Sequence, residues 1–95
     1  MSNYELVYII SPEVTDEELP GVLNKVSGFV SKIGGSVTEV VQWGRKKLAY
    51  PVKKFGEGNY ILAKLEMKPV SIKELEANLK LSNEVIRHLL IRLNA

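Results

Sequence analysis

Apolar side chains recur at strand and helix spacings along the first third of the chain. Residues Tyr4–Ile10 form a short run, YELVYII, of aromatic and β-branched side chains that is typical of a strand. Apolar residues then recur at positions 19, 22, 23, 26, 29, 30 and 33, and spacings of three and four place them on one face of a helix. Thr15 and Glu18 have the spacing of a capping box at the start of this helix. Pro20 predicts an irregular first turn, and Gly34-Gly35 ends the helix.

The middle of the chain predicts a long β-hairpin. Residues Ser36–Trp43 alternate between two sets of side chains, as in a strand, and the Gly44 that follows predicts a bulge. The run KLAYPV, residues 47–52, continues the extended chain, and FGEGN, residues 55–59, has the composition of a turn. The run YILAKLEM, Tyr60–Met67, is then the partner strand of the hairpin.

A second helix and a last strand complete the chain. Ser71 and Glu74 repeat the capping-box spacing, with Val70 before them as a hydrophobic staple. The run VIRHLLIRL, Val85–Leu93, has the pattern of a strand. The order βαββαβ in a single domain of residues 1–95 predicts an α+β, ferredoxin-like fold, in which two helices cover one face of a four-stranded antiparallel sheet.

The face of this sheet that the helices do not cover, here the open face, is expected to be apolar. In the first strand, in the strand Tyr60–Met67 and in the last strand, both alternating sets of side chains are largely apolar, and the helices can cover only one set. We expect Tyr4, Leu6, Tyr60 and Leu62 on the open face. Contiguous exposed apolar area usually marks a contact with another molecule. The alternative is that local loops cover this face.

Positive charge is concentrated in the middle of the chain, although the net charge of the 95 residues is only +2. Five basic residues lie between positions 41 and 55 without an acidic one: Arg45, Lys46, Lys47, Lys53 and Lys54. Four aromatic residues are set among or next to them: Trp43, Tyr50, Phe55 and Tyr60. A cluster of this kind attracts polyanions. The alternative is an ordinary solvated surface.

The composition excludes several kinds of site. The chain has no cysteine and one histidine, His88, so it offers no thiolate nucleophile, no disulfide and no metal cluster. A ferredoxin-like phosphatase needs a glycine-rich anion loop after its first strand, whereas this chain has the acidic run SPEVTDEEL there. We therefore expect no enzyme activity, no cofactor and no small-molecule substrate.

Membrane and export signals are also missing from the sequence. No apolar run approaches the roughly 20 residues of a membrane helix. The start MSNYELVYII lacks the basic, then apolar, then small-residue order of a signal peptide. We expect a cytoplasmic protein without a membrane partner.

Three segments resemble the marker segments of one protein family. They are YELVYIISPE near the start, WGRKKLAYPVKK in the middle and SNEVIRHLLIR near the end. In this order and at these separations, the chain resembles the bacterial small-subunit ribosomal protein S-six family over essentially its whole length. The resemblance implies a non-catalytic ribosomal protein of ferredoxin-like fold. It also implies binding to small-subunit ribosomal RNA on the platform, beside small-subunit protein S-eighteen.

The resemblance further implies roles for particular residues. The family's basic motif falls on residues 45–47, its tight turn on Gly44 and its last-strand arginines on Arg87 and Arg92, while its first-strand tyrosine falls on Tyr4. With the charge and aromatic pattern, this gives nine candidate RNA-binding residues: Tyr4, Arg45, Lys46, Lys47, Tyr50, Lys53, Lys54, Arg87 and Arg92. Five candidate residues for the protein partner are Leu6, Trp43, Leu48, Tyr60 and Leu62.

A protein-interaction or regulatory domain is the alternative function. Its open face would bind another chain or a small ligand, and the basic hairpin would be incidental. Co-sedimentation with small ribosomal subunits at moderate salt supports the ribosomal function. A homodimer without ribosome or RNA association supports the alternative.

Overall fold

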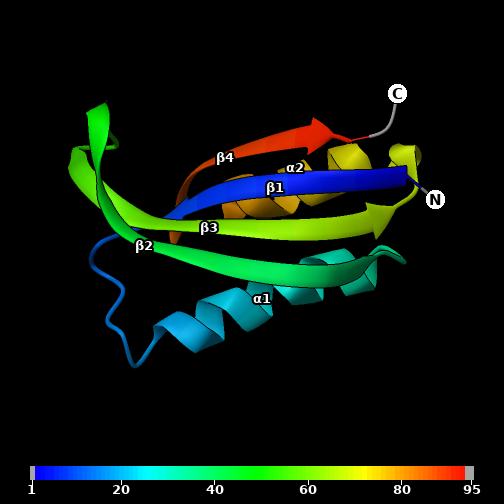
Figure 1. Ribbon diagram of the computed structural model, residues 1–95, viewed down its shortest axis with the longest axis horizontal. Helices are drawn as coiled ribbons and strands as arrows, with labels where there is room; N and C mark the ends of the chain where they lie inside the picture. The colour runs from blue at the N-terminus through cyan, green and yellow to red at the C-terminus, as the bar shows by residue number, and fades with distance from the viewer. Residues whose placement is uncertain (1, 94–95) are drawn as a thin grey trace.

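The computed structural model describes residues 2–93 as a four-stranded sheet with two helices packed against one face (Figure 1). Along the chain the elements are β1 (Ser2–Ile10), α1 (Leu19–Lys32), β2 (Ser36–Val52), β3 (Phe55–Met67), the short 3₁₀ helix η1 (Pro69–Ser71), α2 (Ile72–Leu81) and β4 (Val85–Arg92). The strand order is β2-β3-β1-β4, and each neighbouring pair is antiparallel. This is the predicted ferredoxin-like architecture, with β2 and β4 at the two edges.

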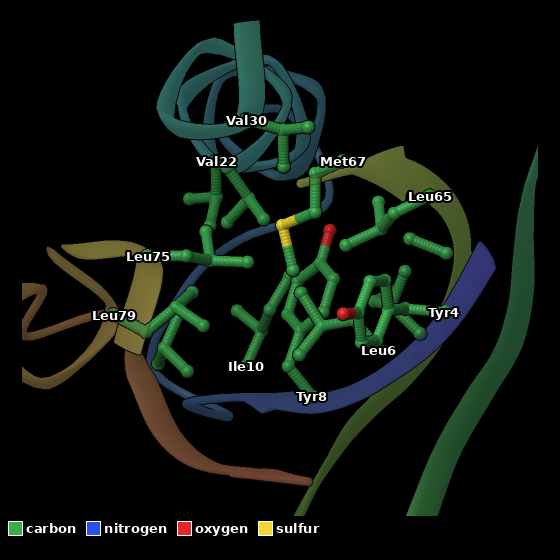
Figure 2. Close-up of a cluster of buried hydrophobic side chains, with 14 of the residues drawn as sticks. Tyr4, Leu6, Tyr8, Ile10, Val22, Val30, Leu65, Met67, Leu75 and Leu79 are labelled. Carbon is green, nitrogen blue, oxygen red and sulfur yellow. The ribbon is translucent and has the colours of Figure 1, made fainter. Parts of the chain in front are cut away.

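The hydrophobic core lies between one face of the sheet and the inner sides of both helices. Successive side chains of a strand point to opposite faces, so alternate residues of β1 and β3 enter this core. Helix α1 contributes Val22, Val26 and Val30, spaced four residues apart, and α2 contributes Leu75 and Leu79. In Figure 2 the labelled side chains of both helices point toward those of β1 and β3. Burying one such side chain contributes about 1.5–3 kcal/mol relative to leaving it exposed.

Tyr4 and Leu6 belong to this core, so the expectation that they lie on the open face is wrong. Tyr4 is 1% exposed and Leu6 is 0% exposed. They pair with Leu65 and Ala63 of β3, which also point toward the helices. Because both alternating sets of β1 are apolar, the pattern alone left open which set the helices cover. Neither side chain has the exposed surface that contact with RNA or a partner requires.

The β2–β3 hairpin differs from its predicted outline. Strand β3 already begins at Phe55, so the turn is Lys53-Lys54 and not the run 55–59. Both lysines have a left-handed backbone, with φ of 48° and 73°. The type I′ turn, a two-residue hairpin turn that matches the twist of its strands, requires this conformation at both positions. The glycine-rich run 55–59 therefore lies within a strand, where cross-strand pairing overrides its local turn composition.

The predicted bulge at Gly44 is confirmed. Gln42 pairs with Ile61 and Gly44 pairs with Tyr60, so β2 has one extra residue between these two pairs. Gly44 has a φ of +88°, which a residue without a Cβ adopts at little steric cost. A bulge bends its strand and increases the local twist. Beyond it, the turn end of the hairpin curls toward the side of the sheet on which β4 lies (Figure 1).

The two predicted capping boxes have different outcomes. At the first, the Glu18 N–H donates to Thr15 Oγ1 at 3.3 Å and the Thr15 N–H donates to Glu18 Oε1 at 3.0 Å. These bonds to Thr15 hold the pKa of Glu18 below its ordinary value. The second prediction is wrong, because Ser71 makes no side-chain cap and its hydroxyl donates to the Ile33 carbonyl oxygen at 3.4 Å. The predicted staple Val70 is 85% exposed.

Candidate nucleic-acid interface

The distal part of the β2–β3 hairpin, residues 45–59, is here called the hairpin arm, and it folds over the open face of the sheet. Leu48 on its inner side lines one pocket together with Ile9 of β1 and Leu89 of β4. Arg87 Nη1 donates a hydrogen bond to Tyr50 Oη at 2.7 Å. The Arg87 guanidinium carbon lies 5.6 Å from the centroid of the Tyr50 ring. The arm thereby connects the β2 edge with β4 across the sheet.

Lys46 lies on the open-face side of the arm. It pairs across the hairpin with Gly58. Its Nζ lies 5.4 Å from the centroid of the Trp43 ring and 6.0 Å from that of Tyr60. A cation over an aromatic face is attracted by the quadrupole of the ring. Trp43 itself is 45% exposed, so it belongs to the surface and not to the core.

Arg45 and Lys47 point to the outer side of the arm, because they alternate with Lys46 along β2. Arg45 Nη1 donates to Glu57 Oε1 at 3.0 Å, and Arg45 Nη2 donates to the Pro12 carbonyl oxygen at 3.2 Å. Lys47 lies directly opposite Glu57. Arg45 therefore connects the arm to the loop after β1, and several of its donors are already used within the chain.

Lys53 and Lys54 form the tip of the arm. The tip reaches the beginning of β4, where Lys53 borders a shallow depression together with Ile86 and His88. Positive φ at a residue other than glycine costs on the order of 1 kcal/mol or more. Two adjacent lysines in this conformation place two positive charges on a strained, solvent-exposed turn.

The two candidate arginines of β4 lie on opposite faces of the sheet. Arg87 pairs with Ile9 on the open face, whereas Arg92 pairs with Tyr4 on the helix side. Arg92 Nη2 donates to Ser2 Oγ at 3.0 Å. The two arginines therefore point to different sides of the β4 edge.

Tyr60 and Leu62 of β3 lie on the open face, as expected. They pair with Ile9 and Val7 of β1 and alternate with the buried Ile61. Both are half-buried, so each presents part of its side chain to solvent.

Strand β4 also has apolar side chains on the open face, although Leu89 and Ile91 were not among the candidate residues. Leu89 is 58% exposed and Ile91 is 43% exposed. They pair with Val7 and Glu5 of β1 and thus share the open face. The signal was present in the sequence, because Leu89 and Ile91 alternate with the inward-facing Leu90 at a period of two.

An apolar pocket lies between the hairpin arm and the sheet, with a volume of about 220 Å³. Among the ten residues that line it are Val7, Ile9, Tyr60, the candidate Leu48, Val52 and Arg87. Leu48 is half-buried here, on the inner side of the arm.

His88 is held by a neighbour on the helix side of the sheet. Its Nε2 lies 3.6 Å from Glu76 Oε2 of α2. Within residues 2–93, no three His, Asp or Glu side chains are grouped so that they could hold a metal ion. In the same part of the chain, every helix is too short or too polar to cross a membrane.

Comparison with known sequences identifies one family along nearly the whole chain. The sequence model of the family described as ribosomal protein S6 matches residues 3–92. The small ribosomal subunit protein bS6 of Moorella thermoacetica is 43% identical over 93 residues, which cover 98% of this chain and 95% of the relative. That of Clostridioides difficile is 43% identical over 91 residues, covering 96% of this chain and 98% of the relative.

A solved structure gives the same result. The crystal structure of 30S ribosomal protein S6 from Thermotoga maritima matches with a TM-score of 0.89 at 30% sequence identity. The match covers 97% of this chain and 87% of that one. From the family match, the close relatives and the shared fold, this chain belongs to the ribosomal protein S6 family, a non-enzymatic constituent of the small ribosomal subunit.

Proposed function

We propose that this chain binds small-subunit ribosomal RNA together with small-subunit protein S-eighteen, and so supports platform assembly and translation. The hairpin arm contacts the RNA, and the apolar open face receives the protein partner. One observation carries this proposal: Lys46 stands over Trp43 and Tyr60. The cationic arm and the apolar face therefore form one continuous surface, which suits a site where RNA and protein meet.

The charges of the arm suit an RNA backbone. Lys46 lies on its inner side, Lys47 on its outer side and Lys53-Lys54 at its tip. None of the ion pairs among residues 2–93 involves these four lysines, so their charge is available to an anion. Lysines that neutralise phosphates release condensed counterions, which is the source of most sequence-independent affinity.

Tyr50 offers a second mode of RNA contact. Its side chain is 58% exposed, and the Arg87 guanidinium lies close to its ring. Folded RNA is recognised through unstacked bases that lie on aromatic rings and guanidinium groups. Tyr50 and Arg87 together supply both kinds of surface at the inner side of the arm.

The open face suits a protein surface. Trp43, Leu89 and Ile91 are each more than 40% exposed, and Leu89 and Ile91 lie across β1 from the half-buried Leu62 on the same face. Exposed apolar patches of this kind mark interfaces, and aromatic side chains are enriched in their centres. Burial of this face against protein S-eighteen would remove its apolar area from water.

Sedimentation tests the proposed function directly. The purified chain, mixed with small ribosomal subunits that lack it, is centrifuged through sucrose at several salt concentrations, with and without protein S-eighteen. We expect co-sedimentation that survives moderate salt and increases when S-eighteen is present. A homodimer that associates with neither subunits nor RNA would support a regulatory domain instead.

A further inference from the structure

The pocket beneath the hairpin arm is large enough to hold part of another molecule. Its floor consists of Val7 and Ile9 from β1, and Leu48 and Val52 close it from the arm. Its volume is about 220 Å³, whereas an apolar cavity of about 150 Å³ already holds a benzene ring. The pocket therefore has room for one large apolar side chain.

Arg87 gives this pocket one positively charged wall. The guanidinium donates to the neutral Tyr50 hydroxyl at 2.7 Å, and no ion pair among residues 2–93 involves Arg87. A guanidinium has five N–H donors, and its bonds to a carboxylate are stronger than its bonds to a neutral oxygen. The ligand that best complements this pocket is therefore an apolar group with an anion beside it.

The lining favours a protein side chain over a nucleobase. A nucleobase has donors and acceptors around its edge, and each one buried without a partner costs about 1–3 kcal/mol. Among the polar side chains that line the cavity, Arg87 and Tyr50 bond to each other, and Tyr60 adds one hydroxyl. The remaining Arg87 donors bind a carboxylate more strongly than a neutral acceptor. His88 borders the cavity but pairs with Glu76 on the other face. An apolar side chain leaves no polar edge unpaired.

We infer, on the basis of the proposed function, that this pocket anchors one large apolar side chain of the protein partner. A carboxylate next to that side chain pairs with Arg87. The pocket adjoins the exposed Leu89 of the open face, so the anchor lies inside the proposed interface and not at its rim. Apolar side chains buried in such central pockets carry most of the binding energy of an interface.

Two variants of the pocket test this inference. Val7→Phe fills the pocket from its floor, because Val7 pairs with Leu62 and Leu89 and points to the open face. Arg87→Gln keeps a donor for Tyr50 but removes the charge. Binding to purified protein S-eighteen is measured by titration calorimetry, and folding by thermal denaturation. We expect each variant to fold and to bind at least about tenfold more weakly, a change of about 1.4 kcal/mol.

Val40→Phe is the matched control, since it enlarges a valine that is 40% exposed on the other face of β2. It should bind S-eighteen as the parent does.

If Val7→Phe does not fold, the affinity of Arg87→Gln for S-eighteen tests the inference instead. Parent-like binding by the variants overturns the pocket assignment but leaves the proposed function intact, because the pair still forms. Weaker binding of Val7→Phe to ribosomal RNA without S-eighteen would identify a nucleotide as the occupant and overturn the inference. Arg87→Gln does not serve for this comparison, because Arg87 is itself proposed to contact RNA. A parent chain that does not bind S-eighteen overturns the partnership and the inference together.

Discussion

Arg45 and Glu57 face each other across the hairpin arm, with Arg45 Nη1 3.0 Å from Glu57 Oε1. Both side chains are 44% exposed, and an exposed ion pair contributes at most about 1 kcal/mol to stability. Its main effect is on the charge of the arm. The carboxylate partly neutralises the arginine, and it also lies opposite Lys47.

Replacing Glu57 by glutamine is expected to strengthen RNA binding. Glu57→Gln removes the negative charge beside Arg45 and keeps the shape of the side chain. If Arg45 then neutralises one more phosphate, the slope of log affinity against log salt steepens by about 0.7–0.9. RNA binding is measured with S-eighteen present at several salt concentrations, with Glu74→Gln on α2 as the control. Weaker binding by Glu57→Gln would mean that the ion pair positions the arm.

Removing the Tyr4 hydroxyl is expected to leave RNA binding unchanged. Tyr4 Oη is buried, and no hydrogen-bond partner for it is found within residues 2–93. A buried hydroxyl without a partner costs about 1–3 kcal/mol. Tyr4→Phe should therefore equal the parent in free energy of unfolding or exceed it by up to about 1 kcal/mol. Urea denaturation and RNA titration measure the two quantities. A loss of RNA affinity would return Tyr4 to the RNA-binding residues.

Gly58 is expected to be a sensitive position of the arm. A Cβ there would meet Ile9 Cγ2 and lie 2.9 Å from the Ile10 carbonyl oxygen, whereas a Cβ on Gly56 meets nothing within 4 Å. Overpacking of this kind costs about 1–3 kcal/mol. Gly58→Ala should lower the free energy of unfolding by that amount, while Gly56→Ala should change it little. Equal stability of the two variants in urea would show that the Ile9 side chain moves aside freely.

Several features of the fold were predictable because they depend on local chemistry. Thr15 and Glu18 exchange the two hydrogen bonds that their spacing predicts, in the turn just before α1 begins at Leu19. Gly44 takes the positive φ of a bulge. The family match confirms a non-enzymatic ribosomal protein, located in the cytoplasmic ribosome, as its three marker segments predict. The roles of individual residues in RNA and partner binding stay predictions.

Other features depend on contacts between distant segments, and local patterns did not contain them. Tyr4 could face either side of the sheet because its whole strand is apolar. Lys53-Lys54 carries no turn signal, yet the pairing of Val52 with Phe55 makes it the turn. The hydroxyl of Ser71 has Ile33 as an acceptor in the folded chain, and this replaces its cap. The fold of the arm over the sheet likewise follows from tertiary contacts alone.

A charge on the open face is expected to separate partner binding from folding. Leu62 is half-buried opposite Val7, so the carboxylate in Leu62→Glu can reach water. We expect a change of less than about 1 kcal/mol in the free energy of unfolding, with loss of S-eighteen binding. Val40→Glu on the other face of β2 is the control and should bind normally. A stability loss of several kcal/mol would show that Leu62 is part of the core.

Replacing the two lysines at the tip of the arm is expected to stabilise the chain and to weaken its binding to RNA. Asn-Gly is the preferred pair for a two-residue turn with positive φ at both positions. Lys53→Asn combined with Lys54→Gly should therefore relieve strain and raise the free energy of unfolding by about 1 kcal/mol. The same change removes two positive charges. If both contact phosphate, RNA binding weakens and the slope of log affinity against log salt becomes shallower by about 1.4–1.8.

The double variant Lys46→Gln with Lys47→Gln separates the two effects. It removes the same charge from the arm without altering the turn, so RNA affinity should fall while stability hardly changes, because exposed lysines contribute little to it. Both double variants are compared with the parent by urea denaturation and by RNA titration in the presence of S-eighteen. A tip variant that is more stable and binds RNA as the parent does would show that Lys53 and Lys54 face solvent. The contacts with the RNA backbone would then fall to Lys46, Lys47 and Arg87, which lie nearer the sheet.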